Sequence, residues 1–287
     1  MERHSLNMNS ITRLAPAKVN LSLKILGLRP DGFHDLSSLM LPVSVFDELE
    51  FERKQDGDLE FTCSAPDIPV DEGNLVVRAA RLFCNTFKVP SQLRISLKKG
   101  IPHGAGLGGG SSDAASTLLA LDALFETRLA RQKLAELAAI LGSDVPFFVY
   151  ESAAWIAGRG ERVSPVDSIK SVPLLLVKPP FGVPTPWAYT HWRDSEEIPG
   201  VSYGEQTSAA GFLYNDLERP VFQKYFLLAE LKRWLLQQPE VEAALMSGSG
   251  STVFAVLRVK EAGLALSERL ENEFGPHLWV HLCETMP

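Results

Sequence analysis

A run of glycines in the first half of the chain carries the clearest chemical signal in the sequence. Residues 101–113 read Ile-Pro-His-Gly-Ala-Gly-Leu-Gly-Gly-Gly-Ser-Ser-Asp and include five glycines. Glycines let backbone N–H groups approach an anion closely, and the free N–H groups of a helix's first turn add a positive dipole end. The run therefore predicts a backbone cradle for phosphate rather than an ordinary flexible turn.

Two familiar phosphate-binding loops do not account for this run. Gly104, Gly106 and Gly109 satisfy the dinucleotide pattern G-x-G-x-x-G. A dinucleotide site also needs an acidic residue about 20 positions later, at the end of a second strand, and residues 128–141 look helical. The P-loop pattern G-x-x-x-x-G-K-[ST] does not occur in the sequence. The loop therefore predicts a nucleotide-using enzyme of another kind.

Two ionisable residues outside the loop could supply the remaining chemistry. Phosphoryl transfer needs positioned phosphates, neutralised charge and an oriented hydroxyl nucleophile. A carboxylate can take the hydroxyl proton, and a nearby lysine can keep that carboxylate ionised. Asp144 and Lys18 are candidates for this pair. Each also fits an ordinary role, Asp144 in the first turn of a short helix capped by Ser143 and Lys18 on the solvent-facing side of a strand, so the sequence leaves open whether they meet.

Residue periodicity places these candidates on alternating strands and helices. It predicts strands over 18–25, 36–51 and 93–97 and helices over 74–87, 114–124 and 129–141. Asn74 can cap the first of these helices, and Ser111 or Ser112 can cap the second. The glycine run therefore joins a strand to a helix, as a phosphate loop requires.

The second half of the chain continues the mixture of strands and helices. A hairpin is expected around Gly158–Gly160, and a proline-rich stretch over 179–186 marks a loop or a junction to a second lobe. Further elements are predicted as strands over 174–177, 252–257 and 278–283 and helices over 221–237 and 260–274. The loop Ser247–Ser251 fits a simple turn and a second anion site equally well. The β-α-β ending suits a small α+β lobe.

Composition narrows the functional class. The chain of 287 residues has a net charge of −7, whereas a nucleic-acid-binding surface is basic, so a nucleic-acid partner is not expected. Its three cysteines fit neither a zinc spacing nor a disulfide framework, which favours a reducing compartment. The first ten residues lack the apolar core of a signal peptide, and the apolar stretches are too short to span a bilayer. We therefore expect a cytoplasmic protein with small-molecule partners.

Three segments, in order along the chain, resemble the GHMP kinase family, which includes galactokinase, homoserine kinase and mevalonate kinase. They are 16–21, 102–113 and 247–251. The stretches 29–34, 74–78 and 142–148 resemble the branch of this family that acts on a cytidine diphosphate-linked alcohol. The resemblance covers essentially the whole chain. It implies an α+β, two-lobed GHMP kinase fold, with an N-terminal ATP-binding lobe over 1–165 and a C-terminal ferredoxin-like lobe over 166–287.

The resemblance also implies an activity, namely phosphorylation of the 2-hydroxyl of a cytidine diphosphate-linked methylerythritol in the non-mevalonate isoprenoid pathway, with ATP and Mg²⁺. Asp144 would be the general base and Lys18 its partner. ATP would be bound by the glycine loop and by residues that border the adenine. These are Asn74, Leu75, Lys99, Pro102, Gly104, Ala105, Gly106, Leu107, Gly108, Gly109, Gly110, Ser111, Ser112 and Asp113.

The resemblance places the cytidine end of the substrate against Asn20, Phe33 and His34. Relatives often carry Tyr where Phe33 stands, so ring stacking survives here and a phenol hydrogen bond does not. Tyr189 is the candidate for a second stacking aromatic. The third motif would contribute Gly248 and Ser249, a serine where relatives often carry threonine. Protein ligands of Mg²⁺ are not assigned, and a monomer or weak homodimer is expected.

Two alternatives remain at this stage. The chain could be another GHMP kinase, acting on homoserine or mevalonate, or a non-catalytic nucleotide-binding protein on the same fold. The presence of both Lys18 and Asp144 argues against the second alternative.

Overall fold

The computed structural model describes residues 9–167 and 169–286, which form two compact units. The first unit takes the chain up to Pro16 together with Phe46–Ile101 and Gly109–Tyr150. The second takes Ala17–Val45, Pro102–Gly108 and the chain from Glu151 onward. Both units are thus assembled from segments distant in the sequence, and a single boundary after residue 165 stays a prediction.

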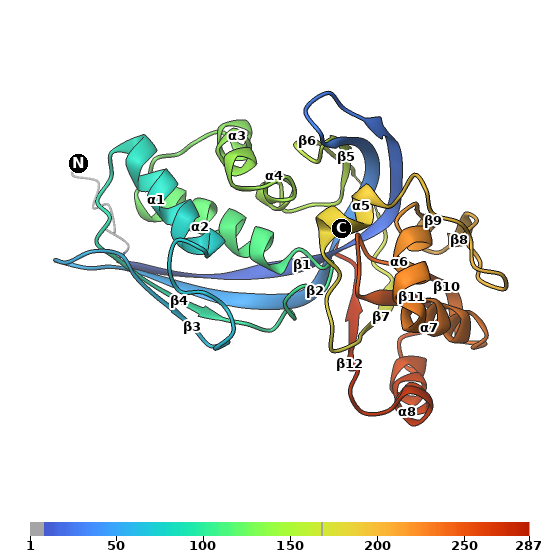
Figure 1. Ribbon diagram of the computed structural model, residues 1–287. Coiled ribbons are helices and arrows are strands. Elements are labelled where there is room, and N and C mark those ends of the chain that lie inside the picture. The colour runs from blue at the N-terminus through green and yellow to red at the C-terminus, as the bar shows by residue number, and fades with distance from the viewer. Residues whose placement is uncertain (1–8, 168, 287) are drawn as a thin grey trace. The chain divides into compact units, whose positions relative to one another are not determined.

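The larger of two sheets is organised around two long strands, β1 (Ser10–Leu28) and β2 (His34–Arg53), which contribute residues to both units (Figure 1). Its strand order is β3-β4-β2-β1-β9-β8, and the hairpin of β5 and β6 pairs with β2. The remaining strands are β3 (Glu60–Cys63), β4 (Leu93–Lys98), β5 (Ala154–Gly158), β6 (Arg162–Pro165), β8 (Gln206–Ser208) and β9 (Gly211–Asn215). The strands predicted over 36–51 and 93–97 and the hairpin around Gly158–Gly160 are therefore confirmed.

Four helices of the first unit lie on one side of its strands, as Figure 1 shows. They are α1 (Leu75–Phe87), α2 (Gly109–Leu124), α3 (Arg131–Leu141) and α4 (Val145–Val149). Helix α2 is buried along most of its length. Asn74 caps α1 as predicted, because its Oδ1 accepts a hydrogen bond from the Val76 N–H at 2.9 Å.

Helix α2 starts earlier than its periodicity predicts. It begins at Gly109, inside the glycine run, rather than at Ala114, so Ser111 and Ser112 lie within the helix and are not caps. Glycine has low helix propensity, so sequence reasoning assigned these positions to the loop. Burial of the helix in the first unit outweighs that propensity.

The second unit contains a four-stranded antiparallel sheet in the order β10-β11-β7-β12. The strands are β7 (Pro173–Lys178), β10 (Val241–Met246), β11 (Val253–Leu257) and β12 (Trp279–Glu284), and the helices are α5 (Thr185–Thr190), α6 (Glu218–Lys224), α7 (Phe226–Leu236) and α8 (Ala262–Phe274). The chain from β7 to β10 passes through α5, β8, β9, α6 and α7, and α8 connects β11 to β12. This connectivity is a split βαβ arrangement, so the predicted ferredoxin-like lobe is confirmed.

Apolar side chains of α7 and α8 pack against the inner strands of this sheet. Leu228, Leu231 and Leu266 belong to one buried cluster with Leu175 and Val253. The single helix predicted over 221–237 is wrong, because the chain leaves helical geometry at Tyr225, with φ −114° and ψ 67°. There the Tyr225 ring stacks on Phe181 at 5.3 Å between ring centroids. This tertiary contact outweighs the local helical pattern.

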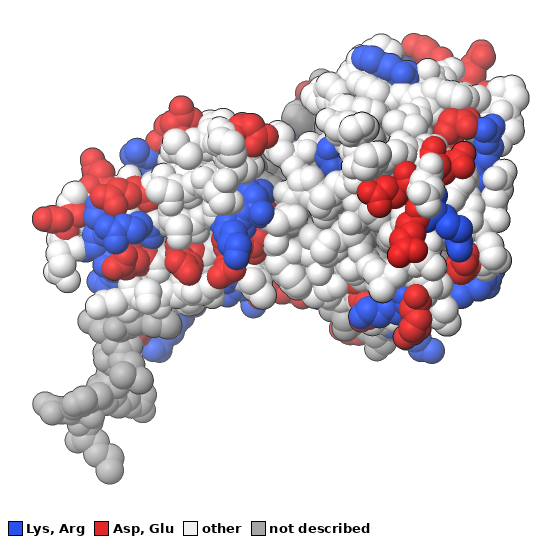
Figure 2. Space-filling view, turned by 90° about the horizontal axis from the view of Figure 1, so that it is seen from below, with Lys and Arg blue, Asp and Glu red and all other residues white. Residues whose placement is uncertain are grey.

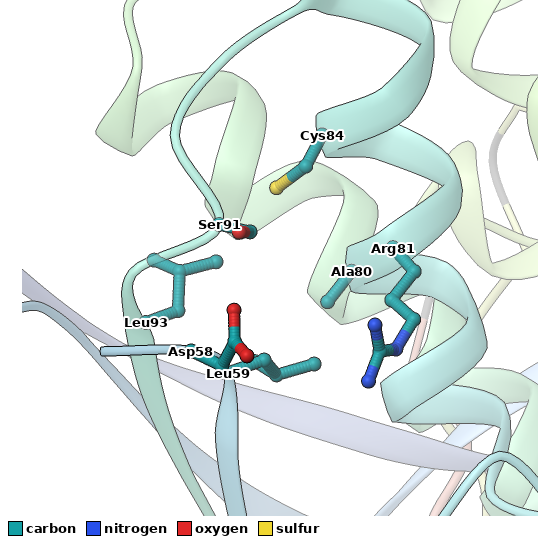
Figure 3. Close-up of a pocket in the computed structure, with 7 residues that line it drawn as sticks. All are labelled: Asp58, Leu59, Ala80, Arg81, Cys84, Ser91 and Leu93. Atoms are coloured by element: carbon teal, nitrogen blue, oxygen red, sulfur yellow. The ribbon is translucent and has the colours of Figure 1, made fainter.

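The surface carries both signs of charge. On the face shown in Figure 2, acidic and basic side chains are interspersed, and neither sign forms a continuous patch. Within the described ranges, no helix is long and apolar enough to cross a membrane. A small hollow in the first unit, shown in Figure 3, is lined by Asp58, Leu59, Ala80, Arg81, Cys84, Ser91 and Leu93. None of the residues predicted to act in catalysis or binding lines this hollow.

Candidate active site

The glycine loop of the second unit is packed against the loop Ser247–Ser251. Gly104, Gly106 and Gly108 have φ values of +62°, +74° and +72°, which L side chains rarely adopt. A Cβ atom on Gly106 would overlap the Ser247 carbonyl oxygen. Ser247 Oγ donates a hydrogen bond to the Gly106 carbonyl at 3.0 Å. The second and third motifs of the sequence therefore meet, and glycine is required where they do.

Lys18 lies in β1 beside this loop, and only 3% of the residue is exposed. Its ammonium group donates hydrogen bonds to Asn20 Oδ1 at 2.6 Å and to the Gly106 carbonyl at 2.8 Å. Its backbone N–H donates to the Leu107 carbonyl at 2.9 Å. The alternative that places Lys18 on the solvent-facing side of its strand is therefore wrong, and its partner Asn20 is only 1% exposed. The first motif thus contacts the same carbonyl as the third.

Ser38 extends this network, and sequence reasoning missed it. Asn20 Nδ2 donates to Ser38 Oγ at 2.8 Å, and Ser38 Oγ donates to the Ser22 carbonyl at 2.6 Å. Ser38 is fully buried on β2. Because the Ser38 hydroxyl accepts a hydrogen bond from the amide nitrogen of Asn20, the amide oxygen of Asn20 points to Lys18. No spacing rule links Ser38 to Lys18, since only the pairing of β1 with β2 brings them together.

The third motif also borders Lys18. Gly248 has a φ of +58°, and a Cβ atom placed there would lie 3.2 Å from Lys18 Nζ and 3.3 Å from Asn20 Oδ1. Asn215 Nδ2 donates to the Met246 and Gly248 carbonyls at 2.7 and 2.8 Å. Ser249 shares a hydrogen bond of 2.8 Å with Thr185. The backbone of this motif therefore borders the lysine directly.

In the first unit, Lys99 forms a buried charge cluster with two aspartates. Its ammonium group pairs with Asp47 and, at 2.8 Å, with Asp113. Asp47 also accepts the backbone N–H groups of Gly100 and Ile101 at 2.7 and 2.8 Å. Burial would lower the pKa of Lys99, but the charges of Asp113 and Asp47 raise it. The aspartates thus fix Lys99 and the chain leading into Pro102.

The start of α2 offers groups that could bind phosphate. Its first-turn N–H groups, beginning at Gly109 and Gly110, have no carbonyl partner within the helix. Among the described residues, Ser112 Oγ and Asp113 Oδ1 are buried without a hydrogen-bond partner. Burial raises the pKa of the Asp113 carboxyl, although Lys99 opposes that rise. Ser111 lies in the same first turns of the helix.

The residues predicted to border adenine are near the start of α2. Leu75 Cδ1 would lie 3.8 Å from a Cβ atom placed on Gly110, and Lys99 Nζ 3.3 Å from one placed on Gly109. Asn74 uses its side chain structurally, since its Nδ2 donates to the Pro69 carbonyl at 2.8 Å in addition to the cap. Any contact of Asn74 with adenine would therefore involve its backbone.

Asp144 lies in the first unit directly before α4. It occupies the N-cap position, which the sequence assigned to Ser143, yet its carboxylate makes no capping hydrogen bond. The side chain is half-buried. The Asp144 carboxylate is therefore not engaged in capping α4, as its predicted role as a general base requires. Its meeting with Lys18, which lies in the second unit, stays a prediction.

The predicted cytidine-binding residues lie in the second unit as an aromatic group. The His34 and Tyr189 rings are 5.5 Å apart between centroids, and Trp192 meets His34 edge-on at 6.3 Å. Phe33 is 48% exposed. Burial, followed by the charge of Arg193, lowers the pKa of His34 and so favours its neutral imidazole. Trp192 was missed, because an isolated tryptophan in a polar stretch carries no sequence signal.

Comparison with known proteins gives a consistent result. The family model for the GHMP kinases N terminal domain matches residues 74–152, and that for the GHMP kinases C terminal matches 205–277. A 4-diphosphocytidyl-2-C-methyl-D-erythritol kinase from Methylacidiphilum infernorum (isolate V4) is 40% identical over 282 residues, which cover 97% of this chain and 98% of the relative.

Solved structures agree with the sequence comparison. The crystal structure of a 4-(cytidine 5'-diphospho)-2C-methyl-D-erythritol kinase matches with a TM-score of 0.79 at 36% identity, covering 96% of this chain and 100% of that one. A homoserine kinase from Cytophaga hutchinsonii matches with a TM-score of 0.69 at 17% identity, covering 100% and 97%. The latter likeness concerns the fold alone.

Proposed function

The chain belongs to the GHMP kinase family and, within it, to the 4-diphosphocytidyl-2-C-methyl-D-erythritol kinases, and from this premise we propose how its residues carry out the reaction. It is a small-molecule kinase. It transfers a phosphoryl group from ATP to the 2-hydroxyl of the cytidine diphosphate-linked methylerythritol, in the non-mevalonate route to isoprenoid precursors. We expect it to work in the cytoplasm, as a monomer or weak homodimer.

The surroundings of Lys18 are the observation that supports its role in the reaction. The buried Lys18 ammonium group is held by Asn20 and the Gly106 carbonyl, beside the backbone of Gly248. A lysine held beside two glycine- and serine-rich loops supplies a positive charge next to backbone suited to bind phosphate. This arrangement supports a role for Lys18 in the reaction.

In the proposed reaction, the backbone N–H groups of the glycine loop and of the first turn of α2 hold the ATP phosphates. The Asp144 carboxylate accepts the proton of the substrate hydroxyl as its oxygen attacks the γ-phosphorus. The bond between the γ-phosphorus and the bridging oxygen breaks, and ADP leaves. Lys18 favours the ionised form of the base and stabilises charge on the transferred group.

Mg²⁺ is part of the proposal, and the residues at the start of α2 fit it. Mg²⁺ bound to nucleotide phosphates keeps several waters and needs only one or two protein oxygens. The unpartnered Ser112 Oγ is such an oxygen. The described residues contain no cluster of three or more His, Cys, Asp or Glu side chains suited to a metal ion. When bound, the ion would neutralise charge on the phosphates.

A coupled ADP-release assay tests the proposed function. Purified protein is given ATP and Mg²⁺ with the cytidine diphosphate-linked methylerythritol, homoserine or mevalonate. We expect turnover with the first alcohol only. Turnover with homoserine or mevalonate, together with none on the cytidine compound, would assign the chain to another activity within the family.

His34→Ala tests the acceptor site separately from the ATP site. His34 belongs to the aromatic group with Tyr189 and Trp192. We expect the KM for the cytidine substrate to rise far more than the KM for ATP, because only the former loses a ring contact. Equal changes in both KM values would remove His34 from the acceptor site.

A further inference from the structure

Arg159 lies at the tip of the β5–β6 hairpin, beside the predicted cytidine site. β5 pairs with the beginning of β2, and Gly158 stands opposite Leu36 in that pairing. The hairpin tip is thereby brought next to Phe33 and His34. The Arg159 guanidinium carbon lies over the Phe33 ring, 5.1 Å from its centroid. All of these residues belong to the second unit.

The backbone of this tip is tightly fixed. Gly158 and Gly160 have φ values of +72° and +123°. The Arg159 N–H donates to Glu161 Oε2 at 2.8 Å, and a Cβ atom on Gly158 would lie 2.6 Å from the same carboxylate group. The position of the Arg159 Cα is therefore set by the hairpin.

Arg159 is half-buried and, among the described residues, forms no ion pair with a carboxylate. An acid does lie near it, because the pKa of Asp31 is lowered first by its hydrogen bond with Arg29 and also by the charge of Arg159. The acids of the adjoining turn, Asp31 and Asp35, both pair with Arg29, at 3.2 and 2.9 Å. A half-buried guanidinium that no carboxylate holds in an ion pair can receive an anion from a ligand.

We propose that Arg159 binds the diphosphate of the cytidine diphosphate-linked substrate. This inference rests on the proposed function and adds a residue that recognises the diphosphate of the substrate. A base stacked in the aromatic group places its phosphates about one ribose away, within reach of an extended arginine. The planar guanidinium can donate two parallel hydrogen bonds to phosphate oxygens, which outweigh a partly exposed contact with an aromatic ring.

Arg159 therefore has two positions in this proposal. Without substrate, its guanidinium rests on Phe33 and shields the half-exposed ring. With substrate bound, the cytosine base stacks on the Phe33 ring and the guanidinium moves to the phosphates. The arginine thus makes affinity depend on the diphosphate, so that cytidine alone is a poor ligand.

The test compares three variants of Arg159 with one control. Arg159→Met keeps an apolar side chain on Phe33 and removes the charge. Arg159→Lys keeps the charge but lacks the planar guanidinium with its two parallel N–H donors. Arg159→Ala removes the charge and the apolar side chain. Arg162→Ala is the matched control, because it makes the same charge change on an exposed residue of the same hairpin. Binding of cytidine and of cytidine 5'-diphosphate is measured by titration calorimetry, with a non-hydrolysable ATP analogue saturating the ATP site.

We expect Arg159→Met to weaken cytidine 5'-diphosphate binding about tenfold or more and to leave cytidine binding within about twofold. Arg159→Lys should lie between, and Arg162→Ala should match the wild type. In turnover assays, the KM for the cytidine substrate should rise while the KM for ATP and kcat stay nearly constant. An equal loss for cytidine and cytidine 5'-diphosphate, or no loss for either, overturns the diphosphate contact.

Failure of the proposed function gives a different result. A wild-type protein that neither binds cytidine 5'-diphosphate nor phosphorylates the cytidine substrate contradicts the function itself. A wild-type protein that does both, with Arg159→Met unchanged, contradicts only the assignment of Arg159.

Discussion

A single backbone oxygen, the carbonyl of Gly106, links three distant parts of the chain. It accepts hydrogen bonds from Lys18 Nζ and from Ser247 Oγ, and it belongs to the glycine loop. The lysine depends on acceptors such as this carbonyl, because an ammonium group buried without hydrogen bonds is strongly unfavourable. The position of Lys18 is therefore determined by groups from all three motifs.

The role of Asp144 can be separated from nucleotide binding. Asp144→Asn keeps the shape of the side chain and removes its basicity. We expect ATP affinity to stay nearly unchanged while turnover falls about 10²-fold or more, the usual effect of losing a general base. ADP release and ATP titration on the same preparation measure both quantities. Near-normal turnover would remove Asp144 from this role.

Ser38 is expected to position Lys18 through Asn20. Ser38→Ala leaves Asn20 Nδ2 without its acceptor, which should cost about 1–3 kcal/mol in the free energy of unfolding. We also expect kcat to fall about tenfold, because a small displacement at a reacting centre slows the reaction, with the KM for ATP unchanged. Steady-state kinetics and denaturant unfolding check both effects.

Two further variants make the Ser38 result specific. Ser38→Thr keeps the hydroxyl and should restore much of kcat. Ser37→Ala removes a hydroxyl from the neighbouring, half-buried position of β2 and should leave kcat unchanged. A loss of stability in Ser38→Ala without a loss of kcat would reduce Ser38 to a structural role.

At the scale of elements, helix α1 depends on its cap. Asn74 accepts the Val76 N–H and donates to the Pro69 carbonyl. We expect Asn74→Ala to lower the free energy of unfolding by about 0.5–2 kcal/mol, the range measured for lost caps. Asn85→Ala, at an exposed position of the same helix, is the control. Equal stabilities of the two variants in urea would contradict the importance of the cap.

Sequence reasoning found the elements that local patterns define. Alternation identified parts of β1 and β4, and Asn74 marked the beginning of α1 correctly. It failed where packing overrules local preference: α2 begins in glycines, and Tyr225 breaks a continuous helical pattern. Periodicity therefore predicted that these helices and strands exist, whereas the start of α2 and the break between α6 and α7 depended on tertiary contacts.

The candidate site divides in the same way. The glycine run and the third motif were recognisable because glycine and serine stand where backbone must approach closely. Ser38, Asp47 and Arg159 were not recognisable, because strand pairing or a hairpin brings each beside residues distant in sequence. Their contacts follow from the topology of the sheet rather than from any local pattern.

At the scale of the whole molecule, each unit encloses one buried cysteine. Burial raises the pKa of the Cys84 thiol to about 11, and burial with the charge of Glu284 raises that of Cys283 to about 12. Both values lie above the ordinary value of 9.0. The associated stability is therefore complete below pH 9 and is lost as the pH rises through 11 and 12.

Thiol alkylation should report the integrity of both units. At pH 8 we expect iodoacetamide to modify Cys84 and Cys283 far more slowly in the native protein than in guanidinium, because the thiolate is the reactive form. Mass spectrometry of peptides gives each rate, with Cys63, which is half-buried, as the internal reference. Native modification at the denatured rate would show that these side chains are not enclosed.

The carbonyl shared by Lys18 and Ser247 also has a consequence for synthesis of the chain. Gly106 and Ser247 are 141 positions apart. At about 5–20 residues per second, the ribosome adds Ser247 on the order of ten seconds after Gly106. During that interval the nascent chain carries Lys18 and the glycine loop without the Ser247 hydroxyl, which binds the same Gly106 carbonyl. Catalytic competence therefore arises only near the end of translation, and a chain truncated before residue 247 should be inactive whatever its remaining structure.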